Sequence, residues 1–267
     1  MIPKPAIILF LFMGYSCLIA QSNSDWSYKV KWQARPSIGL NFPLKKLFNN
    51  SITDNLIDYH DGTNYYLQVI TVSYFFHKHW GVEFSYQGSS SNKANGKNRG
   101  NRFAEMLLNE YGANYFITPS SGASYGNSNI FEGNVGSGLI GIIYRKEFNR
   151  FFVHPKLAFG ITSFYTDWGE TILKEKNSNN LLKINYSTGK LPNDHFTTVN
   201  SLVVGYKITE KIFWSIEVSA SYFKTDFKYK RKVIDQSTGM ISISDFSQYK
   251  KDIFMLGIGT GLNVVIK

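Results

Sequence analysis

Apolar and polar side chains alternate one by one between Ile212 and Tyr222. The even positions are apolar, the odd positions from Ser215 onward are polar, and Phe213 is the one exception. A period of two residues is typical of a β-strand whose two faces meet different surroundings. The segment therefore predicts a strand with one apolar face and one face of serines and a glutamate.

The same alternation recurs in pairs of segments that are joined by short turns. Residues 202–208 precede a turn at 209–211, and residues 70–76 and 80–86 flank a turn at 77–79. A third pair, 133–145 and 153–161, flanks a turn at 146–150. These pairs predict three hairpins. The apolar face of 133–145 stays open, because its aliphatic residues occupy both parities.

Two further alternating segments, 32–42 and 254–266, lie near the ends of the chain and bring the number of strands to eight. The other connections are long: 44–64, 89–131, 165–196 and 225–250. An even number of strands with alternating short and long connections is typical of outer-membrane barrels. We predict an all-β fold, an eight-stranded antiparallel up-and-down transmembrane β-barrel with short periplasmic turns and long extracellular loops. Within 102–116, helical spacing of apolar residues also predicts a short surface helix.

The polar face separates a membrane barrel from a soluble lipocalin-like barrel. It carries mainly small residues such as Ser215, Ser219, Gly257 and Gly259, whereas a water-facing surface would hold more Lys and Glu. Small residues suit the narrow interior of an eight-stranded barrel. The apolar face carries aromatic residues near strand ends, which predict a membrane girdle, although aromatics are common in all strands. The predicted girdle is Phe76, Trp80, Tyr86, Tyr206, Trp214 and Tyr222.

The first twenty residues predict a secretory signal peptide. Lys4 precedes an apolar run from Ala6 to Met13, and small or neutral residues follow to Ala20. Cys17 is the only cysteine, and lipidation there remains an alternative. We therefore expect a signal at 1–20, a barrel domain at 21–267 and a place in the cell outer membrane. The formal charge of +10 would suit an anionic partner, and export argues against nucleic acid.

This architecture resembles the small outer-membrane β-barrel families of the OmpA/OmpX and PorT-like type over residues 26–267. The likeness includes a final apolar strand that ends in residues 261–267, although the last residue is Lys267 and not an aromatic. The resemblance implies outer-membrane lipid, including lipopolysaccharide, and the barrel assembly machinery as partners.

Strand parity places five charged side chains in the lumen. Buried charges need partners, so we expect an ion-pair network that plugs the barrel, with a proton-relay or catalytic role as the alternative. The five residues are Arg35, Glu83, Lys156, Lys207 and Glu217.

Basic residues gather in the last long connection, where a hairpin turning near 236–239 is expected. Their charge suits the phosphates of lipopolysaccharide or another anionic partner, and a merely solvated ribbon is the alternative. They are Lys228, Lys230, Arg231, Lys232, Lys250 and Lys251.

The histidines give little sign of catalysis. His60 and His195 each adjoin an aspartate in a predicted outer loop, but neither lies in the His-x-Ser-Asn pattern of the lipid A deacylase family. His77 and His79 share a turn without a third metal ligand. We expect no catalytic residue, metal or cofactor.

The predicted function is that of a non-enzymatic envelope scaffold or surface recognition and assembly component that acts through its extracellular loops. An envelope or secretion protein is a further expected partner. The alternatives are a lipid A-modifying enzyme and a carrier of small apolar molecules.

Overall fold

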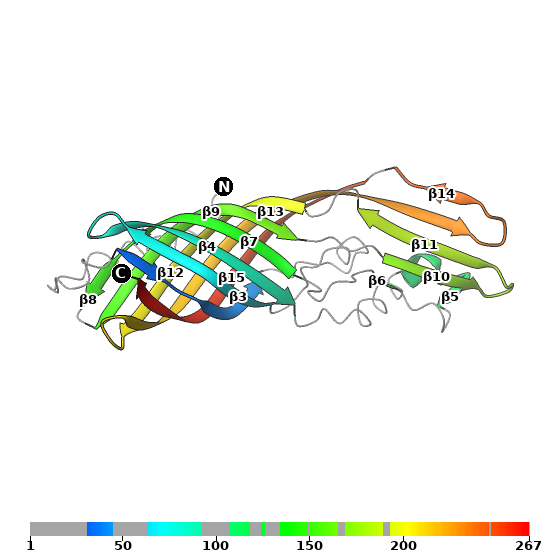
Figure 1. The fold of residues 1–267 in the computed structure, drawn as a ribbon. Coiled ribbons are helices and arrows are strands. Elements are labelled where there is room, and N and C mark those ends of the chain that lie inside the picture. Colours follow the sequence, from blue (N-terminus) through cyan, green and yellow to red (C-terminus); the bar gives the residue numbers. More distant parts are fainter. Residues whose placement is uncertain are drawn as a thin grey trace.

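The computed structural model describes most of the predicted barrel and part of the long connections (Figure 1). The described residues are 31–44, 64–91, 107–117, 124–125, 134–148, 150–164, 169–188, 193–245 and 247–266. The predicted signal peptide, Cys17 and His60 lie outside them.

Eight antiparallel strand positions form a closed barrel, as the alternation predicted. The first position is divided into β1 (Trp32–Ala34) and β2 (Ser37–Pro43). The others are β3 (Asn64–Phe75), β4 (Trp80–Ser91), β7 (Asn134–Tyr144), β9 (Phe151–Phe164), β12 (Asn193–Lys207), β13 (Ile212–Asp235) and β15 (Ser247–Ile266). Because β15 pairs with both β2 and β13, the sheet closes on itself.

The barrel wall turns its polar side chains inward and its apolar side chains outward. On β13, Ser215 and Glu217 are buried, whereas Trp214, Ile216 and Val218 are exposed. A polar interior inside an apolar wall is the arrangement of a transmembrane barrel. Among the described residues, no helix has the length and apolar character that a membrane span requires.

Strand β7 resolves the face that the sequence left open. Leu139 and Ile143 are buried in the lumen, whereas Ile140 and Ile142 are exposed on the outside. Gly141 faces inward, where an added Cβ would lie 2.7 Å from the Cβ of Ala158. Both faces of β7 are therefore apolar, which explains why alternation alone could not assign them.

The predicted turn at 146–150 was too wide. Strand β8 (Lys146–Phe148) pairs with the start of β9, so that Lys146 lies opposite Val153 and Phe148 opposite Phe151. The polar sequence of this segment suggested a turn, but cross-strand pairing carries the hairpin almost to its tip.

The sheet continues beyond the long-loop end of the barrel in a region that we call the β-extension. It comprises β5 (Tyr115–Ile117), β6 (Ser124–Tyr125), β10 (Gly169–Glu175), β11 (Leu181–Thr188), β14 (Ile241–Ile243) and the end of β13 from Tyr229. Residues 107–111 form a short helix inside the predicted range, and residues 102–106 lie outside the described part. Three of the connections predicted as loops thus contain strands, and β11 pairs with β13 beyond the long-loop end of the barrel, at the right of Figure 1.

The predicted hairpin beyond β13 is confirmed. Asp235 is followed by a turn in which Gly239 has a φ of 71° and donates its N–H to the Asp235 carbonyl. A positive φ favours glycine, because other residues would meet a steric penalty there. The chain then returns as β14, which pairs with β13.

Candidate functional site

Four of the five predicted lumen charges form one buried network. Arg35 Nη1 lies 2.6 Å from Glu217 Oε2, and its Nη2 lies 3.6 Å from Glu83 Oε1. Lys156 Nζ lies 2.6 Å from Glu83 Oε1 and 3.2 Å from Glu217 Oε1. Two cations and two carboxylates from different strands therefore balance one another across the lumen.

Neighbouring side chains support this network. Ser73 donates a hydrogen bond of 2.8 Å from Oγ to Glu83 Oε2. The Tyr66 ring fills the space beside Gly39 and Gly259, because a Cβ at Gly259 would lie 1.9 Å from the Tyr66 hydroxyl. The glycines thus leave room for a bulky ring within a narrow barrel.

Lys207, the fifth predicted lumen charge, lies outside this four-residue network. Its Nζ contacts Glu147, whose carboxylate also lies 3.8 Å from Arg145 Nε. The Arg145 guanidinium lies 3.9 Å from the centre of the Phe75 ring. The lumen charges therefore form two layers instead of one five-residue network. The first layer is Arg35, Glu83, Lys156 and Glu217, and the second is Arg145, Glu147 and Lys207. Arg145 and Glu147 were not predicted, because the sequence pattern assigned them to a strand end and a turn.

Aromatic residues fill the lumen between this second layer and the first. Phe152, Phe213 and Val203 are buried together, and the His154 ring lies 4.5 Å from that of Phe152. Above the first layer, a space of about 30 Å³ is lined mainly by Ser, Thr and amide side chains. That space is on the scale of a single water molecule. The described side chains thus leave no wide passage along the barrel axis.

The predicted girdle residues lie on the lipid-facing side of the wall. Phe76, Trp80 and Trp214 are exposed at the short-turn end, and Tyr206 is half-buried against Phe151 at a ring distance of 5.2 Å. Tyr86 and Tyr222 are exposed toward the long-loop end, where the Tyr222 hydroxyl lies 3.0 Å from Asp252 Oδ1.

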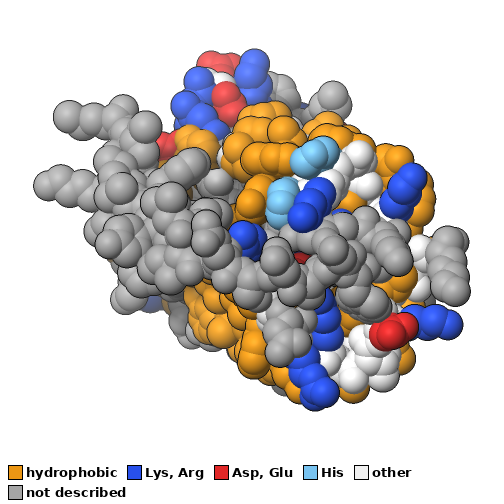
Figure 2. Space-filling model, turned by 90° about the vertical axis from the view of Figure 1, so that its left-hand side faces the viewer, with side chains coloured by type: hydrophobic (Ala, Val, Ile, Leu, Met, Phe, Trp, Pro, Cys, Tyr) orange, Lys and Arg blue, Asp and Glu red, His pale blue; other side chains and the backbone are white. Residues whose placement is uncertain are grey.

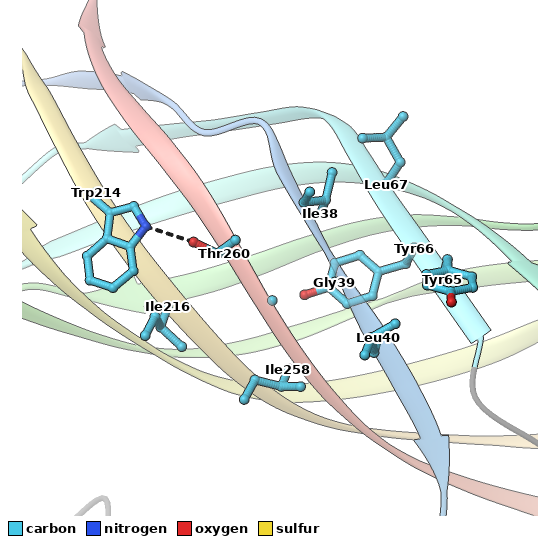
Figure 3. A pocket seen from close by; sticks show the side chains of 11 residues that line it. Ile38, Gly39, Leu40, Tyr65, Tyr66, Leu67, Trp214, Ile216, Ile258 and Thr260 are labelled. Carbon is cyan, nitrogen blue, oxygen red and sulfur yellow. Dashed lines mark hydrogen bonds between the residues drawn. The ribbon is translucent and has the colours of Figure 1, made fainter.

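An apolar depression on the outer wall lies between β13, β15, β2 and β3 (Figure 3). Ile38, Leu67 and Ile216 line it, and Trp214 Nε1 donates a 2.8 Å hydrogen bond to Thr260 Oγ1. Because this wall faces lipid, the depression offers acyl chains an uneven apolar surface rather than an aqueous pocket.

The β-extension has an apolar core of its own on the inner face of its sheet. Leu107 of the short helix packs with Leu173, Leu182, Ile184 and Tyr186. Burial raises the pKa of the Tyr186 phenol, and the Glu110 carboxylate raises it further. The core therefore holds a neutral tyrosine among aliphatic side chains.

The six predicted basic residues divide between two faces of the β13 to β15 ribbon. Lys228, Lys230 and Lys232 share the parity of the lipid-facing Tyr222 and lie on the outer face. Lys250 is also on this face, 3.6 Å from Asp226 Oδ2.

Arg231 and Lys251 have the opposite parity. Arg231 Nη1 pairs with Glu110 Oε1 at 2.9 Å, and its guanidinium lies 5.0 Å from the centre of the Tyr111 ring. Arg231 therefore ties the short helix to the sheet. The backbone carbonyl of Lys251 accepts a hydrogen bond from Thr225 at the top of the lumen.

Asp194 and His195 are neighbours on β12 and point to opposite faces. Ser163 Oγ donates to Asp194 Oδ1 at 2.6 Å on the outside, whereas the His195 side chain is buried inside. They do not form a side-chain dyad. His79 Nδ1 lies 3.0 Å from the Arg145 carbonyl oxygen, and no group of three metal-ligating side chains occurs in the described part of the chain.

No family model matches the chain, and no curated protein matches it. Among solved structures, a major outer membrane protein from Thermus thermophilus is similar at a TM-score of 0.39 and 9% identity, with 89% of this chain and 99% of that chain covered. The outer membrane protease OmpT from Escherichia coli has a TM-score of 0.34 and 5% identity over 92% of this chain and 100% of that chain. The toluene transporter TodX of P. putida has a TM-score of 0.21 and 12% identity over 92% and 80%. These low scores assign no activity to this chain, and its barrel fold rests on the strand pairing above.

Proposed function

We propose that the chain is a non-enzymatic outer-membrane barrel that closes its own lumen and carries a β-extension outside the cell for surface recognition or assembly. The observation that carries this proposal is the change along β13, where the outer face passes from Val218 and Tyr222 to Lys228, Lys230 and Lys232. A transmembrane strand needs about 9–11 residues. The 24 residues of β13 therefore supply both a membrane span and a projecting ribbon.

The filled lumen supports an anchoring role over transport. Two ion-pair layers and the aromatic layer between them occupy the barrel interior. Buried ion pairs hold their geometry, because breaking one leaves an uncompensated charge. Among the described residues, the β-extension is the part beyond the lipid-facing wall that is suited to contact a protein partner, and it has its own core.

The outer lysines are suited to the phosphates of lipopolysaccharide. They continue upward from the lipid-facing Tyr222 at a rise of about 3.3 Å per residue. Ammonium groups bind phosphate as point charges. Lys228, Lys230 and Lys232 would thus meet the phosphorylated sugars just above the acyl chains, while the rest of the extension faces an envelope or secretion partner.

A photo-crosslinking residue at position 230 tests the proposal, with position 225 as the matched control on the same strand, because Thr225 is buried. In intact cells we expect position 230 to crosslink to lipopolysaccharide and position 225 to stay within the chain. Equal crosslinking from both positions, or none from position 230 outside the chain, would contradict the proposal.

Conductance across planar bilayers tests the closed lumen separately. We expect the inserted protein to give no stable stepwise current. A steady channel in the wild-type protein would overturn the anchoring role even if the lysines do bind lipopolysaccharide.

A further inference from the structure

Exposed or half-buried cations surround the short-turn end of the barrel. Each described short turn contributes at least one, and the first strand adds another just before its start. We call this set the basic collar: Lys31, Lys78, Lys146, Arg150 and Lys211. Figure 2 looks onto this end and shows Lys, Arg and His side chains around it. Among the described residues at this end, Glu210 is the one exposed carboxylate, because Glu147 is buried in the lumen.

Strand pairing places Lys146 on the lipid-facing side of the wall. Lys146 lies opposite Val153, whereas its neighbour Glu147 lies opposite the buried Phe152. The Lys146 stem therefore runs along the apolar wall while its ammonium group can reach the polar interface.

A hydrogen bond holds Arg150 at the same level. Its Nη1 donates to the Tyr206 hydroxyl at 3.1 Å, and Tyr206 packs edge-on against Phe151. A guanidinium has five N–H donors, and this bond uses one. Arg150 thus lies beside a lipid-facing aromatic pair, and this bond leaves further N–H donors for an anion.

This arrangement combines two kinds of recognition in one place. Lys146 and Arg150 offer cationic donors at the rim, and Phe151 and Val153 offer an apolar surface directly toward the membrane centre. A phosphodiester with attached acyl chains satisfies both, whereas a free phosphate satisfies only the first. Among the described residues at this end, cations outnumber exposed carboxylates, which favours a headgroup with net negative charge.

We propose that Lys146, Arg150 and Tyr206 form a headgroup site for an anionic phospholipid of the periplasmic leaflet. The site would fix the depth and the rotation of the barrel at the membrane face opposite the extension. The inference rests on the transmembrane barrel and not on the proposed recognition role, since it concerns the other end of the molecule.

The test is native mass spectrometry of the full-length protein released from nanodiscs that contain equal phosphatidylcholine and phosphatidylglycerol. The collar variant carries Lys146→Gln and Arg150→Gln. The matched control carries Lys174→Gln and Lys176→Gln, which remove the same charge in the β-extension. A charge-preserving variant carries Lys146→Arg and Arg150→Lys, and heat-modifiable gel migration verifies that each variant forms a barrel.

We expect the wild-type and control proteins to retain phosphatidylglycerol over phosphatidylcholine. The collar variant should lower this preference on the order of tenfold, and the charge-preserving variant should restore most of it. An equal loss of this lipid preference in the collar and control variants would show that net charge alone determines it, and would overturn the proposed site. Displacement of the bound lipid by millimolar inorganic phosphate would overturn the lipid assignment.

Discussion

The barrel and the β-extension bury opposite kinds of side chain along one continuous strand. In the lower part of β13, Glu217 is buried and Val218 is exposed. In its upper part, Val233 packs against the apolar core while Lys232 lies on the outer face. The backbone pairing is antiparallel throughout, so the change does not come from the fold of the strand.

This inversion shows where the surroundings of the protein change. A wall that faces lipid needs apolar side chains outside and can hold balanced charges within, whereas a sheet in water needs the reverse. Between Tyr222 and Lys228 the outer face passes through Lys224 and Asp226. We therefore place the upper membrane boundary in this stretch.

The largest expected effect comes from unbalancing the lumen. Glu217→Gln leaves Arg35 and Lys156 with only Glu83 as a carboxylate partner. We expect the free energy of unfolding in lipid vesicles to fall by about 3–5 kcal/mol, because a buried charge loses its partner. Urea titration of the refolded barrel measures this.

Two further variants serve as controls for Glu217→Gln. Asp226→Asn removes the exposed partner of Lys250 and should change the free energy by less than about 1 kcal/mol. Adding Lys156→Met to Glu217→Gln restores the charge balance and should recover part of the loss. Similar losses from Glu217→Gln and Asp226→Asn would show that the lumen is not a low-dielectric interior.

A core substitution in the extension should act only on the extension. Ile184 is fully buried, and Ile184→Ala removes apolar contacts worth about 2–5 kcal/mol. Hydrogen exchange should accelerate in β10 and β11 and stay unchanged in β4 and β9. Asn185→Ala, on the outer face of the same strand, is the control. Loss of the whole barrel would mean that the two regions fold as one unit.

The outer face of β13 permits a matched pair of lysine substitutions. Ile216→Lys places a charge on the lipid-facing wall and should cost about 2–4 kcal/mol near the membrane centre. Ile234→Lys, on the same face of the same strand, should cost no more than about 0.5 kcal/mol, because it lies in the extension. Equal losses of unfolding free energy in the two variants, measured by vesicle refolding, would contradict a membrane boundary between positions 216 and 234.

The smallest expected effect concerns the hairpin tip. Hydrogen bonds from the Ser237 hydroxyl and from the Thr238 and Ser237 amides hold the pKa of Asp235 below its ordinary value. The folded pKa is lower than the unfolded pKa, so the stabilisation is present above the unfolded value and is lost as pH falls through the folded one.

At pH values lower than about 4 we expect the hydrogen-exchange protection of the Ser237 and Thr238 amides, corrected for intrinsic exchange, to decrease. Asp235→Ala should remove the pH dependence, whereas Asp245→Ala should preserve it. A pH profile that is the same in both variants would show that Asp235 does not cap the turn.

The barrel was predictable because its two faces differ in chemistry. On β13 the lumen face carries mainly Ser and Glu217, and the same alternation on the other strands predicts that Arg35, Glu83 and Lys156 also point inside. The predicted plugging role of these charges remains a prediction. The lumen face of β7 could not be assigned from the sequence, because both of its faces are apolar. Leu139 packs with Ala158 and Val199 inside the lumen, whereas its neighbour Ile140 is exposed on the outside.

The β-extension was not predicted from the sequence, because its strands are short and lie in segments that were interpreted as loops. Leu182, Ile184 and Tyr186 alternate with Lys183, Asn185 and Ser187, which is a strand signal that lay inside a segment interpreted as a loop. The position of Arg231 on the inner face also follows from parity once β13 is extended to Asp235. The sequence alone does not give the pairing of β11 with β13, because the paired residues lie 41 to 53 positions apart, from Thr188 and Tyr229 to Leu182 and Asp235.

Single-cysteine labelling along β13 tests the inversion most directly. After replacement of Cys17, the only cysteine, cysteines are placed one at a time at even positions from 214 to 234 and at the odd positions 215 and 219. In intact cells a membrane-impermeant maleimide should react at 228–234 and fail at 214–222, where a lipid-soluble reagent should react instead, and neither should reach 215 or 219. Water-soluble labelling at all even positions would contradict the membrane barrel.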